Sequence, residues 1–122
     1  QIYKYVQYDT GSGSVAAVSG QVAYYYTLDG YKNNQVTSDL SDSVEIGAGV
    51  LNSAPTDGQY CWIQIAGPAT LSIALTAGAD GDPLTPTGSG DGTLDVSAAA
   101  TDNVCAIAGD ISDKEIICTF PM

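Results

Sequence analysis

Short runs of apolar residues, or of alternating apolar and polar residues, recur along the chain and are separated by Gly, Pro and Asp. Alternation with period two, rich in Val, Ile, Tyr and Thr, predicts β-strands. The predicted strand segments are QVAYYYTL (21–28), SVEIGAGVL (43–51), QYCWIQI (59–65), ATLSIAL (69–75), GTLDV (92–96), NVCAIAG (103–109) and KEIICTF (114–120). Together with the Asp-Gly turn dipeptides between them, they predict an all-β fold, a small single-domain β-sandwich or barrel of jelly-roll-like type.

Residues 1–20 differ from the rest of the chain. Tyrosines alternate at Tyr3 and Tyr5, Tyr8 follows, and the segment ends in the Gly/Ser-rich run GSGSVAAVSG. An alternating aromatic strand with a flexible spacer is able to pair with the edge of a neighbouring subunit. We therefore expect an extended N-terminal arm and spacer over 1–20 and a β domain over 21–122. The alternative is an ordinary first strand followed by a loop.

The charge of the chain is strongly acidic. Its 122 residues carry 14 acidic side chains and three lysines without an arginine, for a formal net charge of -11. Because nucleic-acid affinity comes largely from Lys and Arg that neutralise phosphates, we expect no nucleic-acid partner. Anionic membrane surfaces are disfavoured for the same reason, and no apolar run approaches the ~20 residues of a membrane-spanning helix.

The chain has three cysteines, which is an odd number, and no two of them have a CxxC spacing. Cys61, Cys105 and Cys118 each lie within a predicted strand segment. Free thiols in such positions usually behave as small buried apolar side chains, so we expect all three to be reduced and buried. One disulfide with a leftover thiol is the alternative.

The sequence offers little for catalysis. It contains no histidine, which removes Ser/His/Asp and Cys/His arrangements and the commonest zinc ligand. The aspartates lie mostly in turn sequences rather than as a carboxylate pair beside aromatic residues. We therefore expect a protein that is not an enzyme and has no catalytic residues, cofactor or metal.

Two local sequences have some features of ligand-binding loops. ADGDP (79–83) has aspartates close enough together to hold Ca²⁺, but it lacks the twelve-residue calcium-loop pattern, so a plain turn is favoured. The glycines of GSGDG (88–92) precede a β-like segment rather than a helix, which disfavours a phosphate-binding loop.

The most strongly patterned stretch, GQYCWIQIAGPATLSIAL (58–75), carries no charged side chain. A packed strand pair or a subunit interface requires such a stretch, because burial of an unpaired charge costs several kcal/mol. Tyr60 and Trp62 alternate within it, and in this setting core or interface positions are favoured over a sugar-stacking role.

The segment G-x-Y-C-W-I-Q-I-A-G-P-A-T (58–70) resembles a pattern of capsid decoration, or cement, proteins of tailed bacteriophages. GDPLTPTGSGDGTLDV (81–96) and NVCAIAGD (103–110) are similar to the later parts of the same layout. The resemblance spans approximately residues 20–122, and the cysteines are not part of the pattern.

The resemblance implies a structural virion protein, often a homotrimer, on the outer surface of the capsid. Such proteins lock neighbouring major capsid subunits together, so the implied partners are the major capsid protein and further copies of this chain. The residues expected to contact the capsid or another subunit are Tyr3, Tyr5, Tyr8 and Trp62.

A protein of another class shares the same features. A glycan-binding β module of a viral fibre or a bacterial surface protein would have the same architecture. Its sugar site would be lined by Trp62, Tyr24, Tyr25, Tyr26 and Tyr31. The alternative therefore predicts that these five aromatic side chains come together.

Overall fold

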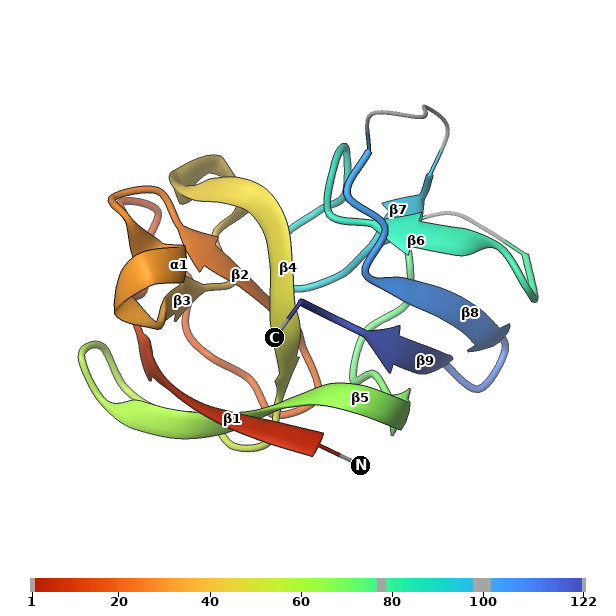
Figure 1. Ribbon diagram of the computed structural model, residues 1–122, viewed down its shortest axis with the longest axis horizontal. Coiled ribbons are helices and arrows are strands. Elements are labelled where there is room, and N and C mark those ends of the chain that lie inside the picture. Colours follow the sequence, from red (N-terminus) through yellow and green to blue (C-terminus); the bar gives the residue numbers. More distant parts are fainter. Residues whose placement is uncertain (1, 77–78, 98–101, 122) are drawn as a thin grey trace.

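The computed structural model describes residues 2–76, 79–97 and 102–121, and its regular structure is almost entirely β (Figure 1). The strands are β1 (Ile2–Tyr8), β2 (Val22–Tyr26), β3 (Gln35–Thr37), β4 (Ser43–Leu51), β5 (Tyr60–Thr70), β6 (Pro83–Thr85), β7 (Asp95–Val96), β8 (Ala106–Asp110) and β9 (Glu115–Thr119). A four-residue helix, α1 (Gly30–Asn33), and a short 3₁₀ turn (Leu40–Asp42) complete the elements. The predicted small all-β barrel is confirmed.

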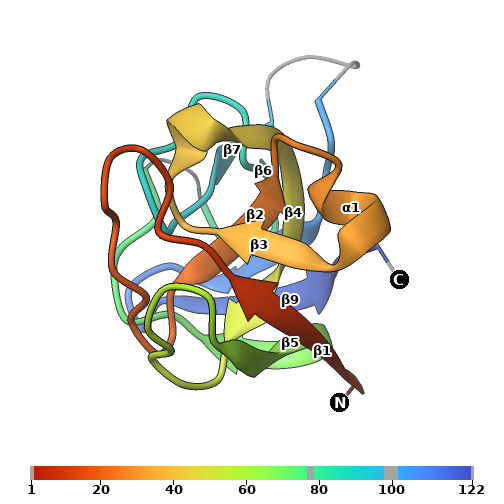
Figure 2. The same ribbon diagram turned by 90° about the vertical axis from the view of Figure 1, so that its left-hand side faces the viewer.

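Five strands form a closed barrel in the order β1-β3-β2-β4-β5, and the pairing of β5 with β1 closes the ring. Figure 2 shows β1 and β3 side by side on the near side of this ring. A closed ring with an odd number of strands cannot be antiparallel throughout. The parallel pair is β1 with β3, and the other four pairs are antiparallel.

Strand β5 belongs to both parts of the molecule. Its first half pairs with β1 and β4 in the barrel, and Ala66–Thr70 pairs with β9, which continues into β8, β6 and β7. In Figure 1, β5 runs along the bottom of the view from the barrel towards this second group of strands. The barrel and the smaller sheet therefore share one strand.

The sequence predicts two separate strands, 59–65 and 69–75, with an interruption between them. The structure has one strand across it, with Gly67 at a φ of 92°. The buried Gln64 side-chain amide donates hydrogen bonds to the carbonyls of Ala66 at 3.1 Å and Pro68 at 2.8 Å. These bonds hold the bend, and pairing with β9 continues through Pro68. A bend supported in this way does not interrupt the strand.

The core is continuous through both parts of the molecule and includes large tyrosines. Tyr8, Tyr24 and Tyr25 are fully buried together with aliphatic residues of all the long strands. The Tyr8 hydroxyl donates to the Val15 carbonyl at 2.7 Å and accepts from the Ser38 amide at 3.2 Å. Burial of a tyrosine ring is tolerated here because the phenolic oxygen has partners.

Residues 2–8 differ from the expected extended arm. They form β1, which is paired on one side with β5 from Ile2 to Gln7 and on the other with β3 at Gln7 and Tyr8. Val6 and Tyr8 are fully buried inside the barrel. The alternative kept for this segment, an ordinary first strand followed by a loop, describes it. The physical reason is that one face of the alternating strand is needed to complete the core.

Candidate functional site

Four aromatic side chains are exposed on the outer side of the β1–β5 pair. Tyr3 and Tyr5 alternate along β1, and Tyr60 and Trp62 alternate along β5. Tyr5, Tyr60 and Trp62 are 51%, 58% and 53% exposed, and Tyr3 is 40% exposed. These four residues are called the aromatic face below. Single exposed apolar residues are ordinary, but a contiguous group of aromatic rings on one strand pair is less common, so this face is the candidate site.

Ring contacts join three members of the aromatic face. The ring centroids of Tyr5 and Tyr60 lie 5.5 Å apart and are stacked, with an interplanar angle of 16°. Those of Tyr5 and Trp62 lie 4.9 Å apart at 52°. Both geometries are in the favourable range for aromatic pairs, which contribute about 0.5–1.5 kcal/mol beyond their buried area. The rings therefore support one another before any partner binds.

The strand register explains why these rings meet. Tyr5 lies directly opposite Trp62, and Gln7 lies opposite Tyr60. The intervening residues point inward, where Val6, Cys61 and Ile63 are buried. Because a shift of one residue would exchange the two faces, the buried side chains fix the position of the exposed rings.

Three of the four predicted contact residues, Tyr3, Tyr5 and Trp62, share this face. Tyr8 does not, because it lies on the same side of β1 as Lys4 and Val6 and is buried in the core. Its prediction as a contact residue is corrected accordingly. Tyr60 was absent from the predicted contact set, although its spacing of two from Trp62 already placed both rings on one side of a strand.

The predicted sugar site of the glycan-binding alternative is not assembled. Tyr24 and Tyr25 are fully buried, so neither lines a surface site. Tyr31 packs its ring against Tyr25, with centroids 4.7 Å apart. The Tyr24 hydroxyl accepts from the Thr93 amide at 2.9 Å, and burial is the main cause that raises the Tyr24 pKa to about 12. β2 lies between β3 and β4 in the barrel, and its Tyr24 and Tyr25 belong to the core, whereas Tyr26 at the end of the strand is only partly buried.

Four carboxylates hold one loop. The backbone amides of residues 10–13 each donate to a different aspartate: Thr10 to Asp57 at 3.0 Å, Gly11 to Asp9 at 2.7 Å, Ser12 to Asp42, and Gly13 to Asp39 at 3.0 Å. These bonds order the loop that follows β1. The aspartates act here as acceptors for backbone amides.

The ADGDP turn uses its carboxylates in the same way. Asp82 accepts from the Ala79 amide at 2.8 Å, and Asp80 accepts from the Ile111 amide at 3.0 Å. The first bond closes the turn, and the second joins the turn to the β8–β9 hairpin.

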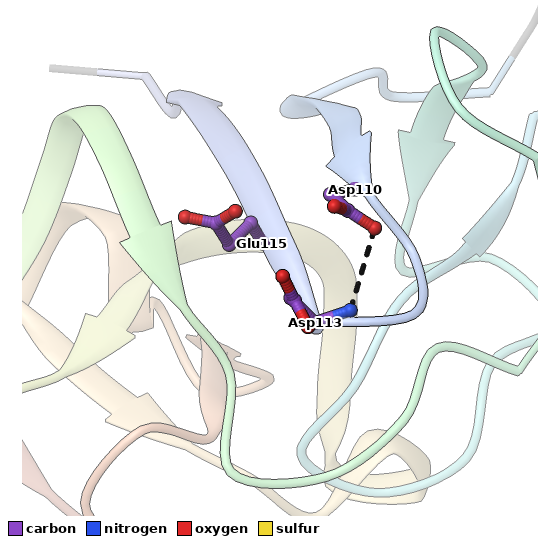
Figure 3. A group of neighbouring side chains, drawn as sticks. All are labelled: Asp110, Asp113 and Glu115. Carbon is purple, nitrogen blue, oxygen red and sulfur yellow. Dashed lines mark hydrogen bonds between the residues drawn. The ribbon is translucent and has the colours of Figure 1, made fainter.

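A carboxylate group that the sequence did not suggest lies at the β8–β9 hairpin (Figure 3). Oxygens of Asp110, Asp113 and Glu115 lie within 4.8 Å of one another, close enough to share a cation. Asp110 accepts from the Ser112 hydroxyl at 2.7 Å, and these bonds from Ser112 and the Asp113 amide lower its pKa. The turn itself accounts for the position of Asp110.

The three cysteines are free and buried, as predicted. Burial raises the pKa of the Cys105 and Cys118 thiols to about 12 and also raises that of Cys61. Since the thiolate is the reactive form, none of them suits nucleophilic chemistry at neutral pH.

This gives a direct prediction for thiol reactivity. In the folded protein at pH 8, a thiol reagent such as dithionitrobenzoate is expected to react with less than about one-tenth of the thiols within minutes, because they are both inaccessible and protonated. After unfolding in guanidinium without reductant, all three are expected to react. Recovery of a single thiol after unfolding would instead demonstrate a disulfide.

Surface grooves do not coincide with the aromatic face. A groove of about 450 Å³ lies along Ser19, Asn52, Gln64, Thr70 and Glu115, and its lining contains no aromatic side chain. Three further grooves of about 320 to 430 Å³ are lined by residues outside the aromatic face. In the described residues, neither short helix has the length or apolar character to cross a membrane.

Neither family models nor curated proteins match the chain.

Proposed function

We propose that the protein is a structural virion protein that binds the outer surface of a phage head and cements neighbouring major capsid subunits. The observation that carries this proposal is the aromatic face, a group of exposed rings on two firmly paired strands. Tyr and Trp are enriched at the centres of protein interfaces, where they supply most of the binding energy. The resemblance of residues 58–70 to capsid decoration proteins supports the same function.

The rigidity of the aromatic face favours a binding role. Tyr5 and Trp62 are directly opposed in the barrel, and their rings are in contact before any partner arrives. Ordering a flexible side chain on binding costs about 0.5–1.5 kcal/mol, so a preformed face loses less of its interaction energy.

The remaining chemistry fits a protein without catalysis. The thiols are buried, and the aspartates around residues 10–13 accept backbone hydrogen bonds. A net charge of -11 suits a surface turned away from packaged DNA and disfavours contact with nucleic acid or anionic membranes.

The mechanism of cementing is mass action. A protein that binds only the assembled shell stabilises it by about 2.7 kcal/mol per site at a free concentration 100 times its Kd. A homotrimer suits a position where three capsid subunits meet, because matched symmetry lets each copy make the same contacts. Such an arrangement needs no metal, cofactor or chemical step.

The experiment is co-sedimentation of the purified protein with capsids that lack it. The wild-type protein is expected to pellet with the shells to a saturating stoichiometry. Ile111→Ala, on the β8–β9 turn and outside the aromatic face, is expected to pellet equally. A protein that stays in the supernatant at every concentration would contradict the proposal.

A glycan-binding module is the second candidate function. It is favoured by the exposed, stacked rings of Tyr5 and Tyr60, because sugar rings bind to aromatic faces. Against it, the polar groove beside Gln64 and the aromatic rings do not form one site. A glycan array separates the two functions, since the capsid proposal expects no saturable sugar binding.

A further inference from the structure

The chain already contains a cation packed on aromatic rings. The Lys4 ammonium lies 5.2 Å from the ring centroid of Tyr25 and 5.5 Å from that of Tyr31, and donates to the Tyr25 hydroxyl at 2.8 Å. Lys32 is in α1 and Lys114 is in the β8–β9 turn. Among the described residues, no lysine lies over Tyr5, Tyr60 or Trp62. The rings of Tyr5, Tyr60 and Trp62 are therefore not covered by a lysine of the described residues.

Two carboxylates, those of Asp9 and Asp57, lie at one end of the β1–β5 strand pair. The Tyr8 amide donates to the Gln59 carbonyl at 2.9 Å and the Gly58 amide donates to the Tyr8 carbonyl at 2.8 Å, so Asp9 and Asp57 lie at this end of the β1–β5 pair, beyond Tyr60. The pKa of the nearby Tyr26 is raised, with the charge of Asp9 as the largest cause and those of Asp42, Asp39 and Asp57 also contributing. Aspartates therefore place negative charge near this end of the barrel, in keeping with the net charge of -11.

Exposed rings beside carboxylates suit a particular partner. Aromatic faces attract cations through the ring quadrupole, by about 0.5–1 kcal/mol at exposed sites and more when water is excluded. Guanidinium groups are planar, weakly hydrated and able to stack, so arginine fits such a surface better than lysine. Acidic residues at the border add attraction over a longer range.

We propose that the aromatic face binds an arginine-bearing segment of the partner protein, with guanidinium groups on Tyr5, Tyr60 and Trp62 and with Asp9 and Asp57 at the border. The identity of the partner as the major capsid protein rests on the proposed function. The arginine chemistry rests on the rings and charges of this chain. The two parts can therefore fail separately.

The chain carries its own reporter for this binding. Trp62 is the only tryptophan, so a ligand on the aromatic face changes the single indole emission. The probes are three blocked peptides of alternating Thr and a second residue, which is arginine, lysine or the neutral arginine analogue citrulline. We expect saturable emission changes with the arginine peptide, binding about threefold to tenfold weaker with the lysine peptide, and none with citrulline.

Variants separate specific docking from general attraction to an acidic protein. Tyr5→Ala and Tyr60→Ala remove exposed rings and are expected to fold, with arginine-peptide binding weakened about threefold to tenfold. Ile111→Ala is the matched control and is expected to bind as the wild type does. Circular dichroism of each variant verifies the fold.

Several outcomes would overturn the inference. Equal affinity of wild type and Tyr5→Ala would show that attraction by net charge alone is responsible. Equal binding of the citrulline peptide would show that no positive charge is required. A change in Trp62 emission with chitotriose but not with the arginine peptide would support the glycan module.

If stripped capsids bind wild type and Tyr5→Ala equally, the proposed function survives and this inference fails. If the arginine peptide binds but stripped capsids do not, this inference survives and the proposed function fails.

Discussion

Deletion of residues 1–8 is expected to abolish folding of the domain. These residues include β1, which closes the barrel between β3 and β5 and contributes the fully buried Val6 and Tyr8. Each such side chain is worth about 1.5–3 kcal/mol of apolar burial, and the deletion also exposes the paired edge of β5. Because a domain of this size is stable by only about 5–15 kcal/mol, the truncated chain should lack a cooperative thermal transition.

Point variants along the same strand test the explanation. Tyr8→Ala is expected to cost about 3–5 kcal/mol, since it leaves a cavity and removes the partner of the Val15 carbonyl. Tyr3→Ala, on the exposed side of the strand, should cost less than about 1 kcal/mol. Urea unfolding measures both. A folded deletion variant with a wild-type melting curve would show that the segment is a dispensable arm.

Asp39→Ala is expected to destabilise the protein by about 1.5–3 kcal/mol, the range for hydrogen bonds to a charged group. The Asp39 residue is 3% exposed, and its carboxylate accepts from the Ser41 hydroxyl at 2.7 Å and from the Gly13 amide at 3.0 Å. Its removal leaves the loop over residues 10–13 without one of four carboxylate acceptors. Hydrogen exchange of the Gly13 amide should rise together with the loss of global stability.

The same carboxylate makes stability depend on pH. The hydrogen bonds from Ser41, and then that of the Gly13 amide, hold the Asp39 pKa below its ordinary value of 3.8. A lowered folded-state pKa means that the stabilisation is present above the ordinary value and is lost as pH falls below about 4. Asp39→Asn should therefore be less stable at pH 7 and lose less stability between pH 5 and 2.

Asp29→Asn is the control for this acid dependence. Asp29 is exposed at a φ of 58°, a conformation that asparagine also adopts readily, so its stability curve should follow the wild type. An unchanged acid limb in Asp39→Asn would show that other groups cause the loss of stability at low pH.

The strands that sequence pattern predicts best are those with a long alternating or apolar run. β4 has the predicted bounds, 43–51, and every residue of its second half, 47–51, is buried. β3 and β6 were not predicted, since three-residue strands such as Gln35–Thr37 are too short to show a period. Thr37 and Thr85 are fully buried in these strands, which only tertiary context explains.

The aromatic face could be predicted in part. Alternation along each strand places Tyr3 with Tyr5 and Tyr60 with Trp62, but local pattern does not reveal that β1 pairs with β5 and brings Tyr5 opposite Trp62. The same limit explains the error over Tyr8. Its phase in the strand indicates the face opposite to Tyr5, and only closure of the barrel shows that this face is the core.

Thermal release of the packaged genome tests the central claim most directly. Capsids stripped of the protein are reloaded with wild type, Trp62→Ala or the exposed control Ile111→Ala, and the release temperature is measured with a dye that binds free DNA. The account predicts that wild type and Ile111→Ala raise this temperature by several degrees, and that Trp62→Ala raises it little at the same concentration. A release temperature that wild-type protein leaves unchanged, at concentrations that saturate any binding, would contradict the account.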